Sequence, residues 1–441
     1  MAQSTDTVSP APAGGIRSFP RNFWVVILME FFERGSYYGM MSVLAVYLGS
    51  TERGGPGALG FSEHSIGIIM GLITPLLYLL PILSGALAER FGYRRTLLVA
   101  FSLLALGYSL TGFMKSYPMV FAALLVMALG AGTFKPIPSG TIARITNASN
   151  STLGFGIFYW TINLGAFLFP LVLVSYLKSI SWTYVFLLSA VGTGAMILPV
   201  LFLFKEPPRP ENRKTLAEVL AGALAVLKDW RFVLMIVIYS GFWILYFQMF
   251  HTVLWYLKDY VDMAPVESAV NGVIALLGVG YRFRFDVEHV TVMNAGTIIL
   301  LQLIVSRLVA KTPALPTMIA GILLGTSGMA LLAFSNHAFV FLAGVVVFSI
   351  GEMTTHPKFI SYIGLIAPRD KVALYMGYAF LYGVIGSSVG GLLGGFGYEH
   401  FVKNLGQPRL LWLLFASIGV ATVIGLLLFN RFVAPRRNAE A

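Results

Sequence analysis

Twelve long apolar runs, separated by short polar loops, constrain the fold of this chain more than any other feature. Each run is close to or above the roughly 20 mainly apolar residues that an α-helix needs to cross the hydrocarbon core of a membrane. Since 57% of the 441 residues are hydrophobic and only 11% are charged, an ordinary soluble domain is excluded. The sequence therefore predicts an all-α polytopic membrane protein with transmembrane helices at about 23–49, 65–88, 96–114, 118–142, 153–177, 182–204, 232–257, 288–310, 315–335, 338–366, 371–397 and 409–432.

A polar stretch at 205–231 divides the twelve runs into two sets of six. It contains prolines and basic residues, which is typical of a linker. The first residues are rich in Pro, Ala and Ser and lack the basic start and apolar core of a secretory signal, so we expect them to be disordered. The predicted organisation is a cytoplasmic tail at 1–22, a six-helix bundle at 23–204, a cytoplasmic linker at 205–231, a second six-helix bundle at 232–432 and a cytoplasmic tail at 433–441.

Residues 259–287 do not follow the pattern of the other segments. Their apolar part, at 273–279, is too short to span a membrane, and four charged residues follow it closely. We expect an external loop here, with an interfacial helix as the alternative.

The basic residues indicate the orientation of the chain. Nineteen Lys and Arg residues fall on the side of the N-terminus and eight on the other side, which predicts that both termini are cytoplasmic. This topology explains the net charge of +11 better than nucleic-acid binding does, because the basic residues are spread over short loops. The chain has no cysteine, so disulfides and thiolate sites are excluded. Short loops and the lack of cysteine favour a bacterial inner (plasma) membrane.

The first apolar run contains three ionisable side chains. In helical geometry Glu30, Glu33, Arg34, Tyr37 and Tyr38 share one face. A charge at membrane depth costs about 2.5–3.5 kcal/mol unless it is paired or hydrated, so this face is expected to look inward. We interpret it as a site that handles protons and a polar substrate. The alternative is a Glu/Arg pair that only fixes helix packing.

Two lysines also lie within apolar runs. Lys135 follows a long apolar stretch and precedes Pro136, so we expect it to face the interior, with snorkelling to the cytoplasmic surface as the alternative. Lys358 lies nearer the cytoplasmic end of its run, and snorkelling is the preferred interpretation for it.

The loop between the second and third runs combines small, acidic and basic residues. An acid beside a basic cluster can form ion pairs that exist in one conformation and break in another. The pattern resembles the loop signature of the major facilitator superfamily and implies a gating loop; the alternative is a basic turn set by topology. Its candidate residues are Gly85, Glu89, Arg90, Arg94 and Arg95.

Three further motifs narrow the resemblance. They are Glu30-x-x-Glu33-Arg34-x-x-Tyr37-Tyr38 in the first helix, the stretch from Gly130 to Lys135-Pro136 in the fourth, and Phe158-Tyr159 to Asn163-x-Gly165 in the fifth, with a looser match around Glu352 in the tenth. Together they resemble the proton-coupled oligopeptide transporter family. This resemblance implies the major facilitator fold, two bundles of six helices and a central cavity worked by alternating access.

The resemblance also implies roles for individual residues. A peptide is a zwitterion, so its pocket needs a cation for the carboxylate and acceptors for the amine. The implied substrate-binding residues are Arg34, Tyr38, Lys135, Asn163, Trp243, Asn294 and Glu352. The proton-coupling candidates are Glu30, Glu33, Arg34, Lys135, Glu352 and His251.

Some positions depart from the family pattern. Phe247 stands where many members have an acid, Ala295 where a proline is usual, and Ala379 where tryptophan is common, which predicts a larger pocket on that side. The two extra helices of many bacterial members are missing. The sequence does not show which group replaces the acid. His251, on the predicted helical face of Phe247, and His356, four residues after Glu352, are candidates for proton relay; the alternative is that they are packed polar residues.

The predicted function is proton-coupled symport of di- or tripeptides or related small zwitterions. The alternatives are a divergent member that carries a bulkier or anionic solute, and a transporter-like membrane receptor or scaffold. No phosphate-binding loop or metal-ligand spacing occurs, so we expect no enzyme activity, no cofactor and no metal. The expected partners are protons, a small-molecule substrate such as a short peptide, and the lipid bilayer.

Overall fold

The computed structural model describes residues 16–49, 58–147, 150–207, 216–278, 280–368 and 371–434. All regular secondary structure in these ranges is helical, so the predicted all-α fold is confirmed. Most of the tail predicted at 1–22, all but two residues of the tail predicted at 433–441, and residues 208–215 of the predicted linker lie outside the described residues.

The N-terminal half runs from the first helix to α10. Prolines interrupt three of its spans because they lack an N–H group: Pro75 separates α2 from α3, Pro136 begins α6, and Pro170 lies in the π-helical turn η2. The elements are η1 (Ile16–Ser18), α1 (Arg21–Gly49), α2 (Glu63–Ile73), α3 (Leu76–Phe91), α4 (Tyr93–Phe113), α5 (Tyr117–Phe134), α6 (Pro136–Ile145), α7 (Ser151–Leu168), η2 (Phe169–Val174), α8 (Ser175–Ile180), α9 (Trp182–Ala195) and α10 (Ile197–Phe202).

The linker contains the helix α11 (Leu216–Leu227). The second half follows it, with the elements α12 (Trp230–Phe247), η3 (Gln248–Phe250), α13 (Thr252–Tyr260), α14 (Ala264–Leu276), α15 (Glu288–Val309), α16 (Ala314–Phe334), α17 (Ala338–Ile366), α18 (Val372–Ala379), α19 (Leu381–Gly397), η4 (Tyr398–Asn404) and α20 (Pro408–Phe432). The loop predicted at 259–287 therefore contains a helix, as the alternative allowed. The apolar residues of this segment are too few for a membrane span, but they are enough to form one side of the 13-residue helix α14.

Within the described residues, eleven helices are long and apolar enough to cross a membrane, from Glu63–Phe91 to Pro408–Phe432. The first helix, α1, is not among these eleven, and it carries Glu30, Glu33 and Arg34 in its middle. At 1.5 Å per residue its 29 residues reach roughly 43 Å, which exceeds the hydrocarbon thickness of about 30 Å. We therefore count α1 as the twelfth span, and the chain is an integral membrane protein.

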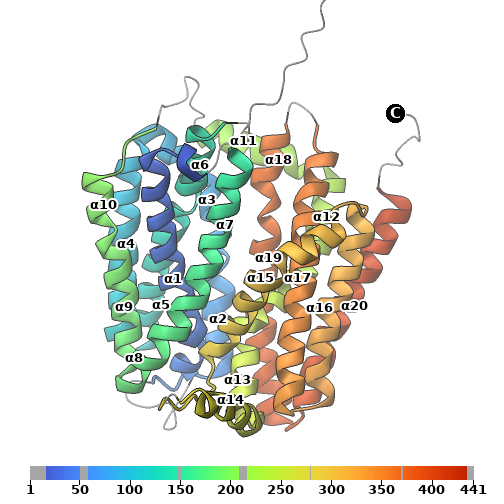
Figure 1. Ribbon diagram of the computed structural model, residues 1–441. Helices are drawn as coiled ribbons and strands as arrows, with labels where there is room; N and C mark the ends of the chain where they lie inside the picture. The colour runs from blue at the N-terminus through green and yellow to red at the C-terminus, as the bar shows by residue number, and fades with distance from the viewer. Residues whose placement is uncertain are drawn as a thin grey trace, which may run out of the picture.

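The two halves lie side by side (Figure 1). The helices of the first half, coloured blue to green, stand beside those of the second half, coloured yellow to red. The first residue of α1 and the last residue of α20 lie at the same end of the molecule, together with α11 and α18. We call this the terminal end, and we call the end that carries α14 the opposite end.

Near the opposite end, α2 of the first half packs directly against α19 of the second. A Cβ atom on Gly391 would lie 2.4 Å from the backbone nitrogen of Gly71, and one on Gly395 would lie 2.6 Å from the Cα atom of Gly67. Real Cβ atoms essentially never approach other atoms so closely. The four glycines therefore allow the two backbones to touch, and this contact closes the space between α2 and α19.

We expect Gly391→Leu to open the opposite end. The new side chain meets backbone atoms of Gly71, which cannot rotate away, and such overpacking costs about 1–3 kcal/mol. That cost shifts a two-state equilibrium roughly 5- to 150-fold. Because the chain has no cysteine, spin labels on Ser116→Cys and Asn404→Cys, one in each half, can report the distance across this end.

The matched control for this measurement is Gly156→Leu. A Cβ atom at Gly156 meets nothing within 4 Å, so the same substitution there should leave the label distance unchanged. An unchanged distance distribution in Gly391→Leu would show that the glycine contact does not hold this end closed.

Candidate functional site

A cavity of about 720 Å³ lies between the two halves, within the range usual for small-molecule sites. It extends from Glu30 and Arg34 in the middle of α1 to Glu89 near the end of α3 and Glu218 in α11. It is lined by Glu30, Arg34, Tyr38, Tyr78, Pro81, Ile82, Gly85, Ala86, Glu89, Lys135, Pro136, Ser139, Phe158, Tyr159, Ile162, Glu218, Val219, Leu374, Gly377, Tyr378 and Phe380.

Three charged residues of α1 form a buried cluster. Arg34 donates two hydrogen bonds to Glu33, from Nε to Oε2 at 2.5 Å and from Nη2 to Oε1 at 2.7 Å. Oε1 of Glu30, one helical turn earlier, lies 3.7 Å from the same Nε. Glu33 is fully buried and does not line the cavity, whereas Glu30 and Arg34 do. The predicted common face is therefore divided: Glu33 holds Arg34 from behind, and Glu30 and Arg34 face the cavity.

Lys135 stands at the junction between α5 and α6, where Pro136 starts a new helix. Its Nζ lies 4.1 Å from the centre of the Tyr78 ring and 3.4 Å from the carbonyl oxygen of Leu77. No carboxylate of the described residues is paired with this ammonium group. The cavity thus contains a cation that is held by a ring face and a carbonyl and that can still accept an anionic group.

The polar residues predicted in the second half are not part of this lining. Nδ2 of Asn294 donates to Oε2 of Glu352 at 3.1 Å and to Oγ of Ser349 at 2.9 Å. Trp243 is buried, with its ring centre 4.5 Å from that of Tyr382. The structure therefore brings Asn294 together with Glu352, and neither residue lines the cavity.

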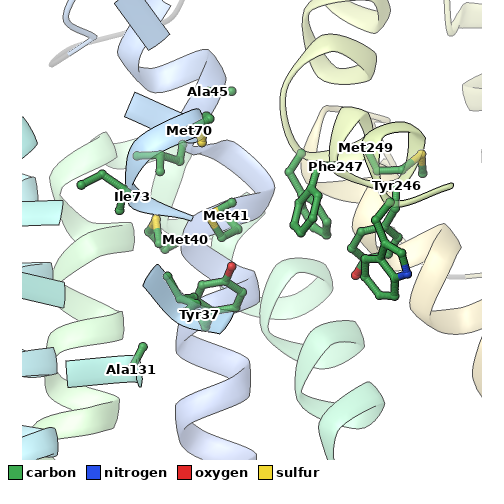
Figure 2. Close-up of a cluster of buried hydrophobic side chains, with 14 of the residues drawn as sticks. Tyr37, Met40, Met41, Ala45, Met70, Ile73, Ala131, Tyr246, Phe247 and Met249 are labelled. Carbon is green, nitrogen blue, oxygen red and sulfur yellow. The ribbon is translucent and has the colours of Figure 1, made fainter. Parts of the chain in front are cut away.

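Aromatic and apolar side chains form a layer on the side of the cavity that faces the opposite end. Phe247 meets the ring of Tyr78 edge to face at 5.8 Å, and Phe250 lies 6.2 Å from Tyr38. Figure 2 shows part of the layer, with members from α1, α2, α12 and η3: Tyr37, Met40, Met41, Met70, Ile73, Tyr246, Phe247 and Met249. Phe247 therefore contributes an apolar contact between the halves where the family resemblance implies an acid.

Two substrate-site predictions change in detail. Nδ2 of Asn163 donates to the carbonyl oxygen of Tyr159 in the same helix at 3.0 Å, and Asn163 is absent from the lining. Ala379 is fully buried and does not line the cavity either, whereas its neighbours Tyr378 and Phe380 do. Ala379 is therefore absent from the lining of this cavity, and the pocket enlargement predicted there stays a prediction.

The helical face predicted for His251 is wrong, whereas His356 lies in α17 four residues after Glu352, as predicted, but has another partner. The seventh span leaves α-helical geometry after Phe247, and His251 has φ −144° and ψ −70°, so the expected common helical face does not exist. Nδ1 of His251 lies 2.7 Å from Oγ1 of Thr252. Nδ1 of His356 lies 3.3 Å from the hydroxyl of Tyr239 and does not pair with Glu352 in the described contacts. Both histidines are satisfied by hydroxyl groups instead of a carboxylate.

The predicted gating loop forms its contacts within the first half. Oε1 of Glu89 accepts a hydrogen bond from Nη2 of Arg144 in α6 at 3.0 Å, and Arg94 donates to the carbonyl oxygen of Leu201. A Cβ atom on Gly85 would lie 3.7 Å from Cβ of Pro136, an ordinary contact, so close helix packing does not require glycine there. The two remaining candidates are exposed at the terminal end: Arg90 and Arg95.

Ion pairs join the halves at the opposite end. Nζ of Lys178 in α8 lies 2.7 Å from Oδ2 of Asp286 and 2.6 Å from Oε2 of Glu288 at the start of α15. Glu288 is almost fully buried and also accepts a hydrogen bond from Ser175 at 2.6 Å. A second set lies beside the α2–α19 contact, where Lys403 of η4 pairs with Glu63 of α2 at 3.5 Å. Both sets, together with the glycine contact, hold this end closed.

We expect Lys178→Met to loosen the opposite end. Removing the cation leaves the buried Glu288 carboxylate without its ion pair, and breaking such a pair costs about 2–5 kcal/mol. The distance between labels at positions 116 and 404 should lengthen. Lys403→Met is the companion variant, and its effect should be smaller because the Lys403 side chain is 44% exposed.

The pH dependence of this contact follows from Asp286. Burial raises the pKa of Asp286, but the Lys178 ammonium and the backbone N–H of Val287 outweigh burial and hold that pKa below its usual range. A lowered pKa gives stability that is present at higher pH and lost as pH falls through the lowered value. The label distance should therefore stay constant from about pH 8 to pH 5 and change only in stronger acid. A label distance that lengthens between pH 8 and pH 5 would mean that a titratable group other than Asp286 controls the closure of this end.

Sequence reasoning missed two lining residues that carry chemistry. Tyr78 supplies the ring face for Lys135, and Glu218 places a carboxylate of the linker helix α11 at the cavity. Tyr78 could have been recognised in the sequence, because it is the one aromatic residue in the aliphatic run between Pro75 and Pro81. The signal for Glu218 was the amphipathic stretch that became α11.

Comparisons with known proteins agree with the fold and the motifs. A sequence profile of the Major Facilitator Superfamily matches residues 23–285 and 284–441. Dipeptide and tripeptide permease B of Photorhabdus luminescens is 30% identical over 194 residues, which cover 43% of this chain and 38% of the permease. Dipeptide and tripeptide permease A of Klebsiella pneumoniae (strain 342) is 28% identical over 227 residues, which cover 50% of this chain and 44% of that permease. These matches span less than half of the length of either relative.

Solved structures share the fold over nearly the whole chain. A POT family transporter in complex with 5-aminolevulinic acid superposes with a TM-score of 0.79 at 20% identity and covers 96% of this chain and 99% of its own. The peptide transporter POT in complex with sulfate has a TM-score of 0.77 at 20% identity and covers 96% of each chain. The resemblance to POT-family permeases predicted from the motifs is therefore confirmed by the sequence comparisons, and the solved structures share the fold.

Proposed function

Because this chain belongs to the Major Facilitator Superfamily and is related to POT-family di- and tripeptide permeases, we propose that it is a proton-coupled symporter. Its substrates are di- or tripeptides or related small zwitterions. Its two six-helix bundles, 23–204 and 232–432, move against each other around the cavity by alternating access.

The observation that supports this proposal best is the unpaired Lys135 ammonium group in the cavity beside Glu30 and Arg34. A fixed cation in a partly desolvated site attracts the carboxylate of a zwitterion. The cavity carboxylate of Glu30 is free of the bidentate contact that holds Glu33, so it can bind either a substrate amine or a proton. Protonating Glu30 leaves Arg34 paired with Glu33 and changes the net charge that faces the substrate, which couples the two ligands.

The direction of access follows from the ends of the molecule. The opposite end is closed by ion pairs and by the glycine contact, and the cavity reaches toward the terminal end. If the terminal end is cytoplasmic, as the distribution of basic residues predicts, this is the inward-facing state of a transporter in a plasma membrane.

Uptake into proteoliposomes under an inward proton gradient tests the proposal. The labelled solute is a dipeptide, and the competitors are unlabelled di- and tripeptides, free amino acids, 5-aminolevulinic acid and small organic anions. We expect uptake that requires the gradient and that short peptides compete. A folded protein that takes up another of these solutes with protons but no dipeptide would contradict the substrate assignment and leave proton coupling intact.

One observation favours a second substrate class. The residues of α17 and α15 that could bind an amine, Glu352 and Asn294, do not line the cavity, and Phe247 presents a ring in place of an acid. A cavity whose unpaired charge is a lysine suits an anionic solute that has no amine. In the same assay, competition by organic anions without competition by peptides would select this alternative.

A further inference from the structure

Residues 264–286 form a hairpin with a fixed shape, apart from residue 279, which is not described. We call it the α14 hairpin. Asn271 in α14 binds the returning chain twice: its Nδ2 donates to the carbonyl oxygen of Phe283 at 2.9 Å, and its Oδ1 accepts from the N–H of Phe283 at 2.7 Å. Oε1 of Glu267 accepts from the N–H of Phe285 at 2.9 Å. These hydrogen bonds hold α14 and the returning chain in one arrangement, so the residues at the tip form a defined surface.

The tip of this hairpin exposes large apolar side chains. Leu276 is 88% exposed, Leu277 is 72% exposed, and Val273 and Tyr281 are both more than half exposed. The other side of α14 is packed, because Val266 is buried. Contiguous apolar surface of this kind is rare on a water-facing protein and marks a contact with lipid or with another molecule.

The position of the hairpin favours lipid. In Figure 1, α14 lies across the axes of the spanning helices at the opposite end. It is connected to α13, which ends at Tyr260, and to α15, which starts at Glu288, so it lies at the level where these spans leave the hydrocarbon core. A helix that lies in this plane with an apolar side is typical of an interfacial helix.

The charges beside the tip point to the kind of lipid. Arg282 and Arg284 are both exposed, and neither has a carboxylate partner among the described residues. Basic residues next to a membrane attract anionic headgroups, and tyrosine is enriched at the headgroup level. An apolar tip, a tyrosine and two unpaired arginines within twelve residues complement the acyl–headgroup boundary of an anionic leaflet.

We propose that the α14 hairpin binds anionic phospholipid. Val273, Leu276 and Leu277 enter the acyl–headgroup boundary, and the two arginines bind the lipid phosphate. The hairpin ends at Asp286, which pairs with Lys178 of the other half. A lipid bound at Arg284 is therefore two residues from an ion pair that holds the opposite end closed. This proposal does not depend on the identity of the transported solute.

The first test measures depth in the membrane. A spin label on Leu277→Cys, in vesicles of phosphatidylglycerol and phosphatidylcholine, should be accessible to oxygen and shielded from a water-soluble nickel complex. Leu300→Cys, 75% exposed within α15, is the lipid-facing reference, and Asn404→Cys, exposed at the same end as the hairpin, is the water-facing reference. Val273→Cys repeats the test at a second position. Labels at 273 and 277 that are as open to nickel as the label at 404 would overturn the proposal.

The second test measures lipid choice. The double variant Arg282→Gln/Arg284→Gln should bind fluorescent phosphatidylglycerol more weakly, by about fivefold for each arginine, with phosphatidylcholine binding unchanged. Arg409→Gln is the control, because it removes a cation that lies over the Phe334 ring outside the hairpin. An excess of inorganic phosphate should not displace the lipid. Unchanged phosphatidylglycerol binding in the double variant, or displacement by phosphate alone, would overturn the lipid assignment.

Discussion

Lys135→Ala is expected to reduce gradient-driven uptake by roughly 30-fold or more. The ammonium group of Lys135 is the cavity cation that lacks a carboxylate partner within the described residues. Truncating one partner of a buried charge pair costs about 2–5 kcal/mol, and each 1.4 kcal/mol is a factor of ten. The loss should appear chiefly in the concentration of substrate needed for half-maximal uptake, because the proposed contact is with the substrate carboxylate.

Lys358→Ala is the matched control. Lys358 also lies within a span, α17, but its Nζ donates to the carbonyl oxygens of Ala310 and Thr312 at 3.4 and 2.7 Å, at the end of α15. This geometry agrees with snorkelling, and uptake should stay within about twofold of the parent. Equal losses in the two variants would mean that positive charge in a span, and not the cavity position, matters for uptake.

Glu33→Gln is expected to destabilise the fold. Glu33 is fully buried and accepts both hydrogen bonds of Arg34, so the variant leaves a guanidinium group with Glu30 alone at 3.7 Å. Removing one partner of a buried ion pair costs about 3–5 kcal/mol. The measurement is the midpoint of thermal unfolding in detergent, followed by the retention of folded protein on size exclusion.

Glu30→Gln separates stability from coupling within the same helix. It leaves the bidentate contact between Glu33 and Arg34 intact, so the unfolding midpoint should stay near that of the parent. Accumulation driven by the proton gradient should be lost, while exchange of labelled for unlabelled substrate without a gradient continues. If Glu33→Gln is as stable as the parent, the buried pair is not what fixes this part of α1.

The transmembrane helices were predictable because the local sequence of each apolar run determines whether it forms a helix. A run of apolar residues becomes a helix in lipid whatever its neighbours are, so the predicted bounds agree with the structure to within a few residues at most ends. The charged residues of α1 and Lys135 were predictable for the same reason, since a charge in an apolar run is costly and needs an explanation.

Contacts that depend on backbone irregularity were not predictable. The seventh span changes geometry at Gln248–Phe250 and again at His251, which moves His251 off the helical face that regular spacing assigns to it. A helical wheel assumes one rotation per residue, and that assumption fails at such breaks.

The second half contributes only uncharged residues to the cavity, namely Leu374, Gly377, Tyr378 and Phe380, while the linker helix adds Glu218. In the proposed alternating access, Glu30, Glu33, Arg34 and Lys135 therefore move together with the first half, and the ion pairs of Arg34 do not have to break. Of the pairs at the opposite end that this movement breaks, the one between Lys178 and Glu288 is buried, whereas the one at Lys403 has an exposed ammonium group at the aqueous surface. Ions in the medium screen such surface charges within about 8 Å at physiological ionic strength. The salt concentration on that side of the membrane thus changes the rate at which this end opens, and with it the turnover rate, without changing the affinity for the solute.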